Sequence, residues 1–267
     1  RIADGSAVVT VAIGEEGERW ELEQMRTRVE GGRLSGTKAL VPYASVADQI
    51  IVAATGEQGP GLYLVARRAD GVRCRSLKVN DLTRRLDAVD FDGAEARRIA
   101  GPTAFERMRD AGLVLLAADA YGGSRRCLEM ARDYALEREQ FGQVIGAFQA
   151  VKHRLADFFA RKEIALSNGY WAAWALSSND PELSLAACNL RVAASDAFVL
   201  GSEDMIQVHG GVGFTWEFDC HMYYRRAKLL SLALGGERRW KDRLVSLLET
   251  RNSSGEEREL PEAPAGV

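Results

Sequence analysis

The sequence has few of the residues on which metal sites and disulfide frameworks depend. Among its 267 residues there are only three histidines and four cysteines. The cysteines are far apart and no two of them form a Cys-x-x-Cys pair; they are Cys74, Cys127, Cys188 and Cys220. This spacing predicts reduced, unpaired thiols, and it lacks the ligand patterns of the common zinc sites. We therefore expect no metal centre.

An excess of charge of one sign is also missing. The formal net charge is -3 at pH 7, a value that does not favour a nucleic acid or an acidic membrane surface as a partner. Basic residues are paired at Arg225-Arg226 and at Arg238-Arg239, which we interpret as solvated faces. No apolar run approaches the ~20 residues of a membrane span. The composition thus predicts a cytoplasmic protein with no nucleic-acid partner and no membrane partner.

The beginning of the sequence has no targeting features. It reads Arg-Ile-Ala-Asp-Gly and has no initial methionine. We expect a fragment, a processed chain or a sequence without its natural start.

The first hundred residues contain short runs that are rich in β-branched residues. The clearest runs lie at residues 7–13, 48–54 and 61–66, and a weaker one lies at residues 88–91. Glycine-rich turns separate them. Short strands with turns at this spacing are typical of an antiparallel sheet rather than of alternating strands and helices. We therefore predict an antiparallel β-sandwich or β-barrel domain over residues 1–101.

After residue 101 the apolar residues recur three and four positions apart, which is the helical period. The pattern predicts four helices, at residues 104–135, 148–176, 181–209 and 236–249. We expect them to form an antiparallel four-helix bundle over residues 102–250, which makes the fold class α+β. Residues 251–267 are rich in Ser, Gly, Glu and Pro, and this composition predicts a disordered tail.

The segment between the first two predicted helices carries candidate binding residues. Arg138 stands at a helix end, where a guanidinium can make a bidentate contact with a phosphate. Gln140 and Phe141 follow it and offer a hydrogen-bonding group and an apolar wall for a heterocycle. On the residues alone, the simpler interpretation is an exposed loop in which Phe141 plugs the bundle.

A second candidate lies at the end of the third predicted helix. There Gln207 is followed by Gly210 and Gly211, and glycines let a backbone or a ligand approach closely because they have no Cβ. In this setting Gln207 is placed to contact a diphosphate or an adenine edge. An ordinary helix C-cap with a flexible turn is the alternative interpretation.

Together, these two segments resemble those of acyl-CoA dehydrogenases. Residues 138–157 contain Arg-x-Gln-Phe-Gly and then Phe-Gln-x-Val-x-His-x-Leu-Ala-Asp. Residues 207–215 read Gln-x-His-Gly-Gly-x-Gly-Phe-Thr, and residues 36–48 and 224–228 are also similar to that family. The resemblance covers almost the whole sequence before the tail. It corresponds to the family's middle β domain and C-terminal helical domain, whereas the family's N-terminal helical domain, one wall of its active site, has no counterpart in the sequence.

The resemblance implies an FAD cofactor and an acyl-CoA substrate that is dehydrogenated between its α and β carbons. It implies FAD contacts at Arg138, Gln140, Phe141, Gln207, Gly210 and Gly211. In the family such contacts reach the FAD of a neighbouring subunit, so the resemblance also implies a homo-oligomer or a hetero-oligomer, either a dimer or a tetramer. The flavin is expected between the β domain and the bundle.

The catalytic base of the family has no clear counterpart, and we assign no catalytic residue. Most members carry the base, a glutamate, in the loop before the last helix, where this sequence has Leu234. Other members carry it early in the first bundle helix, where Gly112 and Leu113 match. Only a shift of alignment would bring Glu237 or Asp110 to either place.

The β domain departs from the family as well. Pro42 falls within the segment that supports the flavin in the family, and a proline has no N–H to donate. Three functions remain open. The chain is an FAD-dependent acyl-CoA dehydrogenase with an unusual base, a catalytically reduced subunit that completes the FAD site of an active partner, or a cofactor-free helical scaffold.

Overall fold

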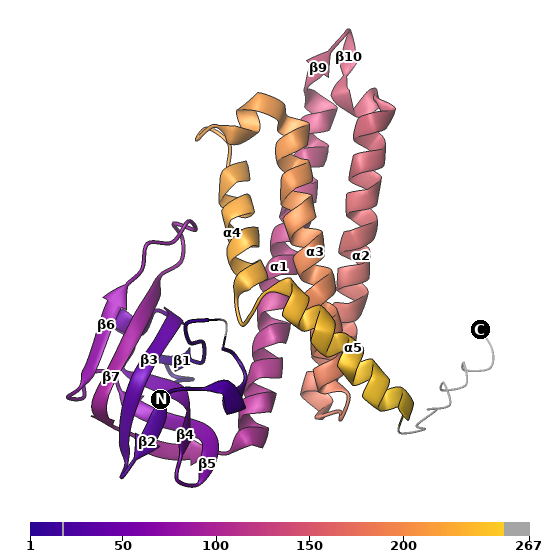
Figure 1. The fold of residues 1–267 in the computed structure, drawn as a ribbon. Coiled ribbons are helices and arrows are strands. Elements are labelled where there is room, and N and C mark those ends of the chain that lie inside the picture. Colours follow the sequence, from indigo (N-terminus) through magenta and orange to yellow (C-terminus); the bar gives the residue numbers. More distant parts are fainter. Residues whose placement is uncertain (18, 254–267) are drawn as a thin grey trace.

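The computed structural model describes residues 1–17 and 19–253, and Figure 1 shows a β half beside a taller group of helices. The main sheet is complete before the first long helix begins, so each half is continuous in sequence. The α+β class expected from the sequence is confirmed. Most of the expected disordered tail, from residue 254 onward, lies outside the described residues, and residues 251–253 belong to a helix.

Eight strands form the main sheet, with the order β6-β7-β3-β2-β4-β5-β8 and with β1 paired to β4. Their bounds are β1 Val9–Ala12, β2 Arg28–Glu30, β3 Arg33–Pro42, β4 Gln49–Gly56, β5 Gly59–Ala66, β6 Val72–Ser76, β7 Leu86–Glu95 and β8 Arg97–Ala100. In β4, Ile50 and Val52 are fully buried and the residue between them is less so. This alternation is why the β-branched runs identify strands.

The sheet differs from the antiparallel sandwich or barrel expected from the sequence. β1 and β2 pair with successive parts of the same edge of β4, and both run parallel to it. β6 and β8 stand at the two ends of the strand order, and no pairing joins them in the described part of the chain. The sheet therefore does not close into a barrel.

Five α-helices follow within the described residues, where four helices were expected. Their bounds are α1 Pro102–Glu137, α2 Gln149–Ser178, α3 Leu183–His209, α4 Cys220–Leu232 and α5 Glu237–Ser253. The additional helix α4 packs beside α1 and α3, and α5 crosses the others obliquely (Figure 1). α4 buries Cys220, Ala227 and Leu230, which lie on one helical face. α4 was not expected from the sequence, where the basic pair within it, Arg225-Arg226, was interpreted as a solvated face.

α3 is the centre of the helical half and contacts each of the other four helices. Its small residues Ala186, Ala187, Ala194 and Ala197 are fully buried, which lets the neighbouring helices approach closely. Contrary to the expectation from the sequence, the segment Leu183–Phe214 is long and apolar enough to cross a membrane. However, 61% of its most apolar stretch is buried within the structure, and this place in the core accounts for its composition.

Ion pairs join the β half to the helices. Arg226 of α4 contacts Asp81 at 2.5 Å, and Arg239 of α5 contacts Glu21 at 2.5 Å. Both carboxylates belong to the β half, before α1 begins. Arg225 also donates to the carbonyl oxygen of Asn80 at 3.2 Å. Three of the four arginines in the two basic pairs therefore contact the β half, which corrects their interpretation as solvated faces.

Candidate cofactor-binding site

The connection between α1 and α2 is a small β hairpin that projects from one end of the helices (Figure 1). Its strands, β9 (Glu139–Gln140) and β10 (Gln143–Val144), are antiparallel and enclose a two-residue turn. Phe141 and Gly142 form the turn with φ angles of 54° and 79°, as tight hairpins require. A phenylalanine adopts such a φ rarely, so this turn holds Phe141 in a strained backbone conformation.

Phe141 does not plug the bundle, so that part of the simpler loop interpretation is wrong. The residue is 93% exposed at the tip of the hairpin. Its ring makes an edge contact with the ring of Phe148, with 6.2 Å between the ring centroids. An aromatic side chain that is both exposed and fixed in position is suited to contact a ligand or another chain.

A hollow of about 360 Å³ lies between the hairpin, the start of α2 and the end of α3. It is lined by Gln140, Phe141, Ile145, Phe148, Ala150, Val151, Arg154, Gln207 and Val208. Most of these residues are apolar, and two carboxamides and one guanidinium are the polar groups. A hollow of this size and composition is typical of a small-molecule site. The structure thus brings together three of the predicted contact residues, Gln140, Phe141 and Gln207.

Stacked rings fix the hairpin end of α1 against the end of α3. The imidazole of His209 stacks on the ring of Tyr134, with 4.3 Å between the centroids and 21° between the planes. The Nδ1 atom of His209 lies 2.8 Å from the carbonyl oxygen of Met205, and the residue is buried. His209 is therefore a packing residue that fixes the end of α3 beside the end of α1.

The other three predicted residues, Arg138, Gly210 and Gly211, do not line the hollow. Gly210 follows α3 with a φ of 65°, and a Cβ on either glycine would meet no atom within 4 Å. The backbone there is open to an approaching group. Arg138 ends α1, is exposed, and has no ion pair within residues 1–17 and 19–253. A free guanidinium suits an anion, and the open backbone leaves room for one to approach.

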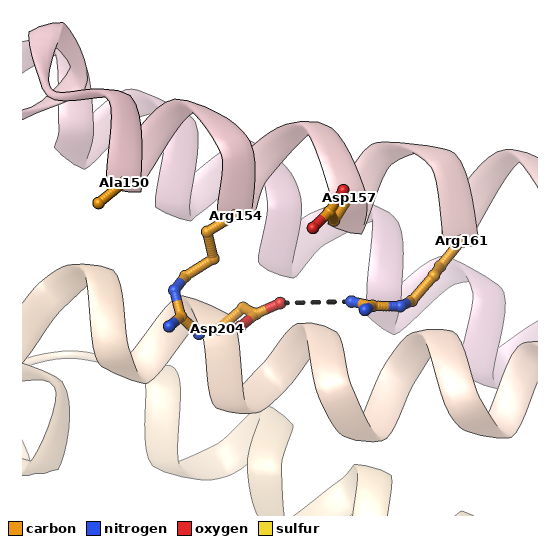
Figure 2. A pocket seen from close by; sticks show the side chains of 5 residues that line it. All are labelled: Ala150, Arg154, Asp157, Arg161 and Asp204. Atoms are coloured by element: carbon orange, nitrogen blue, oxygen red, sulfur yellow. Dashed lines mark hydrogen bonds and ion pairs between the residues drawn. The ribbon is translucent and has the colours of Figure 1, made fainter.

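A second hollow of about 270 Å³ continues from the first along α2 and α3 (Figure 2). It is lined by Ala150, Arg154, Asp157, Arg161 and Asp204. The guanidinium of Arg154 donates to Asp204, and that of Arg161 lies 3.8 Å from the same carboxylate. Sequence analysis did not single out these residues. The spacing of the three charged residues on α2, at i, i+3 and i+7, was the available signal, because it places them on one helix face.

The two positions at which the resemblance places the family's base, Gly112 and Leu234, lie against each other. A Cβ on Gly112 would stand 3.2 Å from the Cδ1 atom of Leu234. Leu234 has a φ of 58° and packs at the edge of two apolar clusters. Both positions are thus apolar, and no carboxylate can reach the substrate from either of them.

The two carboxylates considered as substitutes are otherwise engaged. Asp110 is buried and accepts hydrogen bonds from Arg109, at 3.1 Å, and from Ser184. Glu237 is exposed in the first turn of α5 and is paired with Lys241 on the same helix. Asp110 is therefore held inside the protein and is not free to act as a base, whereas Glu237 is held at the surface of α5 by an exposed pair.

The contact between the β half and the loop before α5 is filled by an indole ring. The Trp20 ring lies 2.8 Å from where a Cβ would stand on Gly14, and 3.5 Å from the same point on Gly235. In the neighbouring strand, Leu40 has a left-handed φ of 55° and breaks the pairing of β3 with β7. The carbonyl oxygen of Pro42 accepts from the Thr10 hydroxyl at 2.5 Å.

Comparison with known proteins relates this architecture to one family. The model of the acyl-CoA dehydrogenase C-terminal domain matches residues 103–239. Acyl-CoA dehydrogenase FadE34 of Mycobacterium tuberculosis is 33% identical over 252 residues, which are 91% of this chain and 35% of that protein. Acyl-CoA dehydrogenase IpdE2 of Mycolicibacterium smegmatis is 29% identical over 90% of this chain and 71% of its own length. The chain thus spans only about a third of the first of these relatives.

Solved structures match over nearly the whole chain. A variant of the Tcur3481–Tcur3483 steroid ACAD has a TM-score of 0.87 and 31% identity, and the match covers 94% of this chain and 70% of that one. The ChsE4–ChsE5 complex from Mycobacterium tuberculosis has a TM-score of 0.85 and 30% identity, with coverages of 92% and 67%. Both the β half and the helical half are therefore shared with these structures.

Proposed function

Because the chain belongs to the acyl-CoA dehydrogenase family, we propose that it is a catalytically reduced subunit that completes the FAD site of an active acyl-CoA dehydrogenase partner. One observation carries the proposal: the residues at both base positions, Leu234 and Gly112, are apolar and pack together. Neither can accept a proton from an acyl-CoA. In contrast, the hollow at the hairpin retains the residue types that the family uses for its cofactor.

The residues at the hairpin end fit FAD by their chemistry. The apolar walls and two carboxamides of the hollow suit a planar heterocycle, since a carboxamide offers both donors and an acceptor. Arg138 and the open backbone at Gly210 and Gly211 suit a negatively charged diphosphate. When bound, FAD supplies the acceptor for the hydride that leaves the β carbon of the acyl-CoA.

The part played by this chain is binding and orientation. Gln140 and Gln207 face one hollow from the hairpin and from α3, so they hold the cofactor from two sides. Phe141 projects beyond these two glutamines and shields the bound cofactor from water. The base that removes the α-proton comes from the partner, because Leu234 and Gly112 cannot accept a proton and Asp110 is buried in its own ion pair.

The partner we propose is a different acyl-CoA dehydrogenase chain rather than a second copy of this one. Two copies that both lack a base would form an assembly without any. The names of two similar structures, Tcur3481–Tcur3483 and ChsE4–ChsE5, are those of two-component assemblies. We propose an acyl-CoA with a steroid-derived acyl group as the substrate, because one of these is named a steroid ACAD. The complex is expected in the cytoplasm.

Purification of the full-length chain, alone and together with an acyl-CoA dehydrogenase chain from the same organism that retains the base glutamate, tests the proposal. Flavin absorbance measures FAD occupancy, and ferricenium reduction measures dehydrogenation of acyl-CoAs. We expect both flavin and turnover only in the complex. Full occupancy and turnover by the lone chain would identify an active dehydrogenase instead, and no flavin in either sample would identify a cofactor-free scaffold. Either result overturns the proposal.

Two substitutions in the complex test the site itself. Arg138→Ala and Gln207→Ala remove groups at the hairpin end, so we expect both to release FAD. Arg132→Ala is the matched control, since Arg132 is an exposed arginine on the same helix that is paired with Asp133 at 2.6 Å and does not line the hollow. Unchanged FAD content in both test variants would contradict the assignment of this site.

A further inference from the structure

Arg154 is the charged residue that the two hollows at the hairpin end have in common. It lines the apolar hollow that contains Gln140 and Gln207, and it also lines the polar hollow that continues along α2. Ala150 is the other shared residue, one helical turn earlier. A ligand in the apolar hollow therefore has a guanidinium at its edge that the family resemblance does not assign.

Asp204 fixes the direction in which this guanidinium points. Figure 2 shows Arg154 reaching from α2 toward Asp204 on α3. Arg154 donates to Asp204, whose side chain is 13% exposed, whereas the side chain of Arg154 is 45% exposed. Asp204 and Gln207 are three residues apart on α3 and so lie on the same face of the helix. The Nη1 atom of Arg154 is thus engaged by Asp204, and Arg154 still lines both hollows, where its other N–H groups are donors without a protein partner among the described residues.

The charges around Arg154 balance. Arg154 and Arg161 are positive and Asp157 and Asp204 are negative, and all four line the polar hollow. Because its charge is already compensated, the pair of Arg154 and Asp204 suits uncharged polar groups, such as ring nitrogens and sugar hydroxyls, better than a phosphate. Arg138 lacks such compensation within the described residues and is left to contact an anion.

We infer that Arg154, oriented by Asp204, binds the adenosine of FAD, and that the diphosphate is left to Arg138. The inference rests on the proposed function and extends it by two residues. The ring nitrogens of adenine and the oxygens of ribose accept hydrogen bonds, and the free N–H groups of Arg154 are donors. The walls of the apolar hollow pack against the faces of the purine.

Ligands that correspond to parts of FAD test this assignment in the complex of the chain with its partner subunit. We expect Arg154→Ala to lower the affinity for FAD by about tenfold or more, as the loss of a charge-assisted hydrogen bond predicts. Calorimetry on the complex freed of flavin measures the affinity for each ligand. In the Arg154→Ala variant, we expect the affinity for ADP to fall by a similar factor, whereas the affinity for inorganic pyrophosphate stays at the wild-type value. We expect Arg138→Ala to lower the affinity for both ADP and pyrophosphate.

Control variants separate binding from folding. Arg161→Ala removes an arginine that also faces Asp204 but does not line the apolar hollow, so FAD affinity stays at the wild-type value. Arg154→Lys keeps a cation beside Asp204 and preserves the fold, but it loses the planar fork. We therefore expect Arg154→Lys to bind FAD more weakly than the wild type while it unfolds at the same temperature.

The outcomes distinguish the inference from the proposal on which it rests. If Arg154→Ala and Arg154→Lys bind FAD normally while Arg138→Ala and Gln207→Ala release it, the role of Arg154 is overturned and the partner-subunit proposal stands. If all four variants keep FAD, both fail. If Arg154→Ala weakens pyrophosphate as much as ADP, Arg154 binds a phosphate and the assignment to adenosine is wrong.

Discussion

The Cδ1 atom of Leu234 lies 3.2 Å from where a Cβ would stand on Gly112. This contact joins the loop before α5 to the first half of α1, and it predicts the effect of Gly112→Ala. The new methyl group needs Leu234 to move by a few tenths of an ångström, whereas alanine favours the helix by roughly 0.5–1 kcal/mol. We expect a change in the free energy of unfolding within about 1 kcal/mol, measured by urea denaturation.

The double variant Gly112→Ala with Leu234→Ala isolates the contact. Once Leu234 is shortened, alanine at position 112 meets no obstacle and should contribute its full helical preference relative to Leu234→Ala alone. An equal effect of Gly112→Ala in both backgrounds would show that the two positions are not coupled.

Lys38 is a buried cation whose partner lies in the same half of the molecule. Its Nζ atom is 2.8 Å from Oε1 of Glu15 and 3.0 Å from the carbonyl oxygen of Ile13, and Lys38 is fully buried. We expect Lys38→Met to lower the free energy of unfolding by about 3–5 kcal/mol, because it leaves Glu15 buried without its partner. Adding Glu15→Gln should recover part of that loss. A double variant less stable than Lys38→Met would contradict this account.

The same pair predicts how stability depends on pH. Burial raises the pKa of Glu15, but hydrogen bonds from Lys38, Thr27 and the Arg26 backbone outweigh it, and the result is about 2 instead of 4.5. This contribution is fully present above pH 4.5 and is lost as the pH falls toward 2. Burial lowers the pKa of Lys38 to about 8 from 10.5. Between these values the unfolded chain holds a proton that the folded chain has released, so the contribution of Lys38 to stability rises with pH.

Urea denaturation over a range of pH checks this prediction. We expect the wild type to lose more stability than the Glu15→Gln, Lys38→Met double variant between about pH 5 and 3. If the free energy of unfolding fell equally with pH in both proteins, the pair of Glu15 and Lys38 would not be the cause of the loss of stability in acid.

Local patterns predicted the strands that contain an uninterrupted run rich in β-branched residues, and for that reason β1, β4, β5 and, more weakly, β7 were expected. β3 was missed because Gly36, Lys38 and Pro42 interrupt its pattern. Lys38 is buried there only because Glu15, 23 residues earlier, neutralises it. Pairing at such a distance leaves no trace in a local window, so the sequence could not indicate that a lysine belongs to the core.

The residues of the candidate site also fall into those that the local sequence could predict and those that it could not. Gln140, Phe141 and Gln207 could be predicted because family motifs mark them, and the structure places them in one hollow. The pairing of Arg154 with Asp204 spans 50 residues and two helices. It depends on how α2 and α3 face each other, which hydrophobic periodicity does not specify.

Arg191 holds the loop that carries Leu234. The residue is 1% exposed, and its Nη2 atom donates to the carbonyl oxygens of Leu230, at 2.5 Å, and Ala233, at 3.0 Å. Burial lowers its pKa to about 10, so it stays charged at neutral pH. We expect Arg191→Met to lower the free energy of unfolding by at least about 2 kcal/mol, since two buried carbonyls lose a charged donor.

Arg191→Lys tests whether the forked geometry matters. A lysine keeps the charge but places its donors at one point, so we expect an intermediate loss of stability. Faster amide hydrogen exchange confined to residues 230–236 would place the effect in this loop. If Arg191→Lys were as stable as the wild type, the charge and not the fork would be what holds the loop.

Phe141 combines a strained backbone with an exposed ring, and the two predict opposite effects of one substitution. Its φ is 54° and it is 93% exposed. A left-handed φ costs a residue with a Cβ about 1–2 kcal/mol, and glycine adopts it freely. We expect Phe141→Gly to leave the lone chain as stable as the wild type or more stable by up to about 1 kcal/mol. In the complex it should lose FAD, because the ring is gone.

Phe141→Ala keeps the strain and removes the ring, so it should lose FAD without the gain in stability. If both variants kept FAD, the exposed ring would have no part in the site; if Phe141→Gly unfolded more easily, the turn would not be strained.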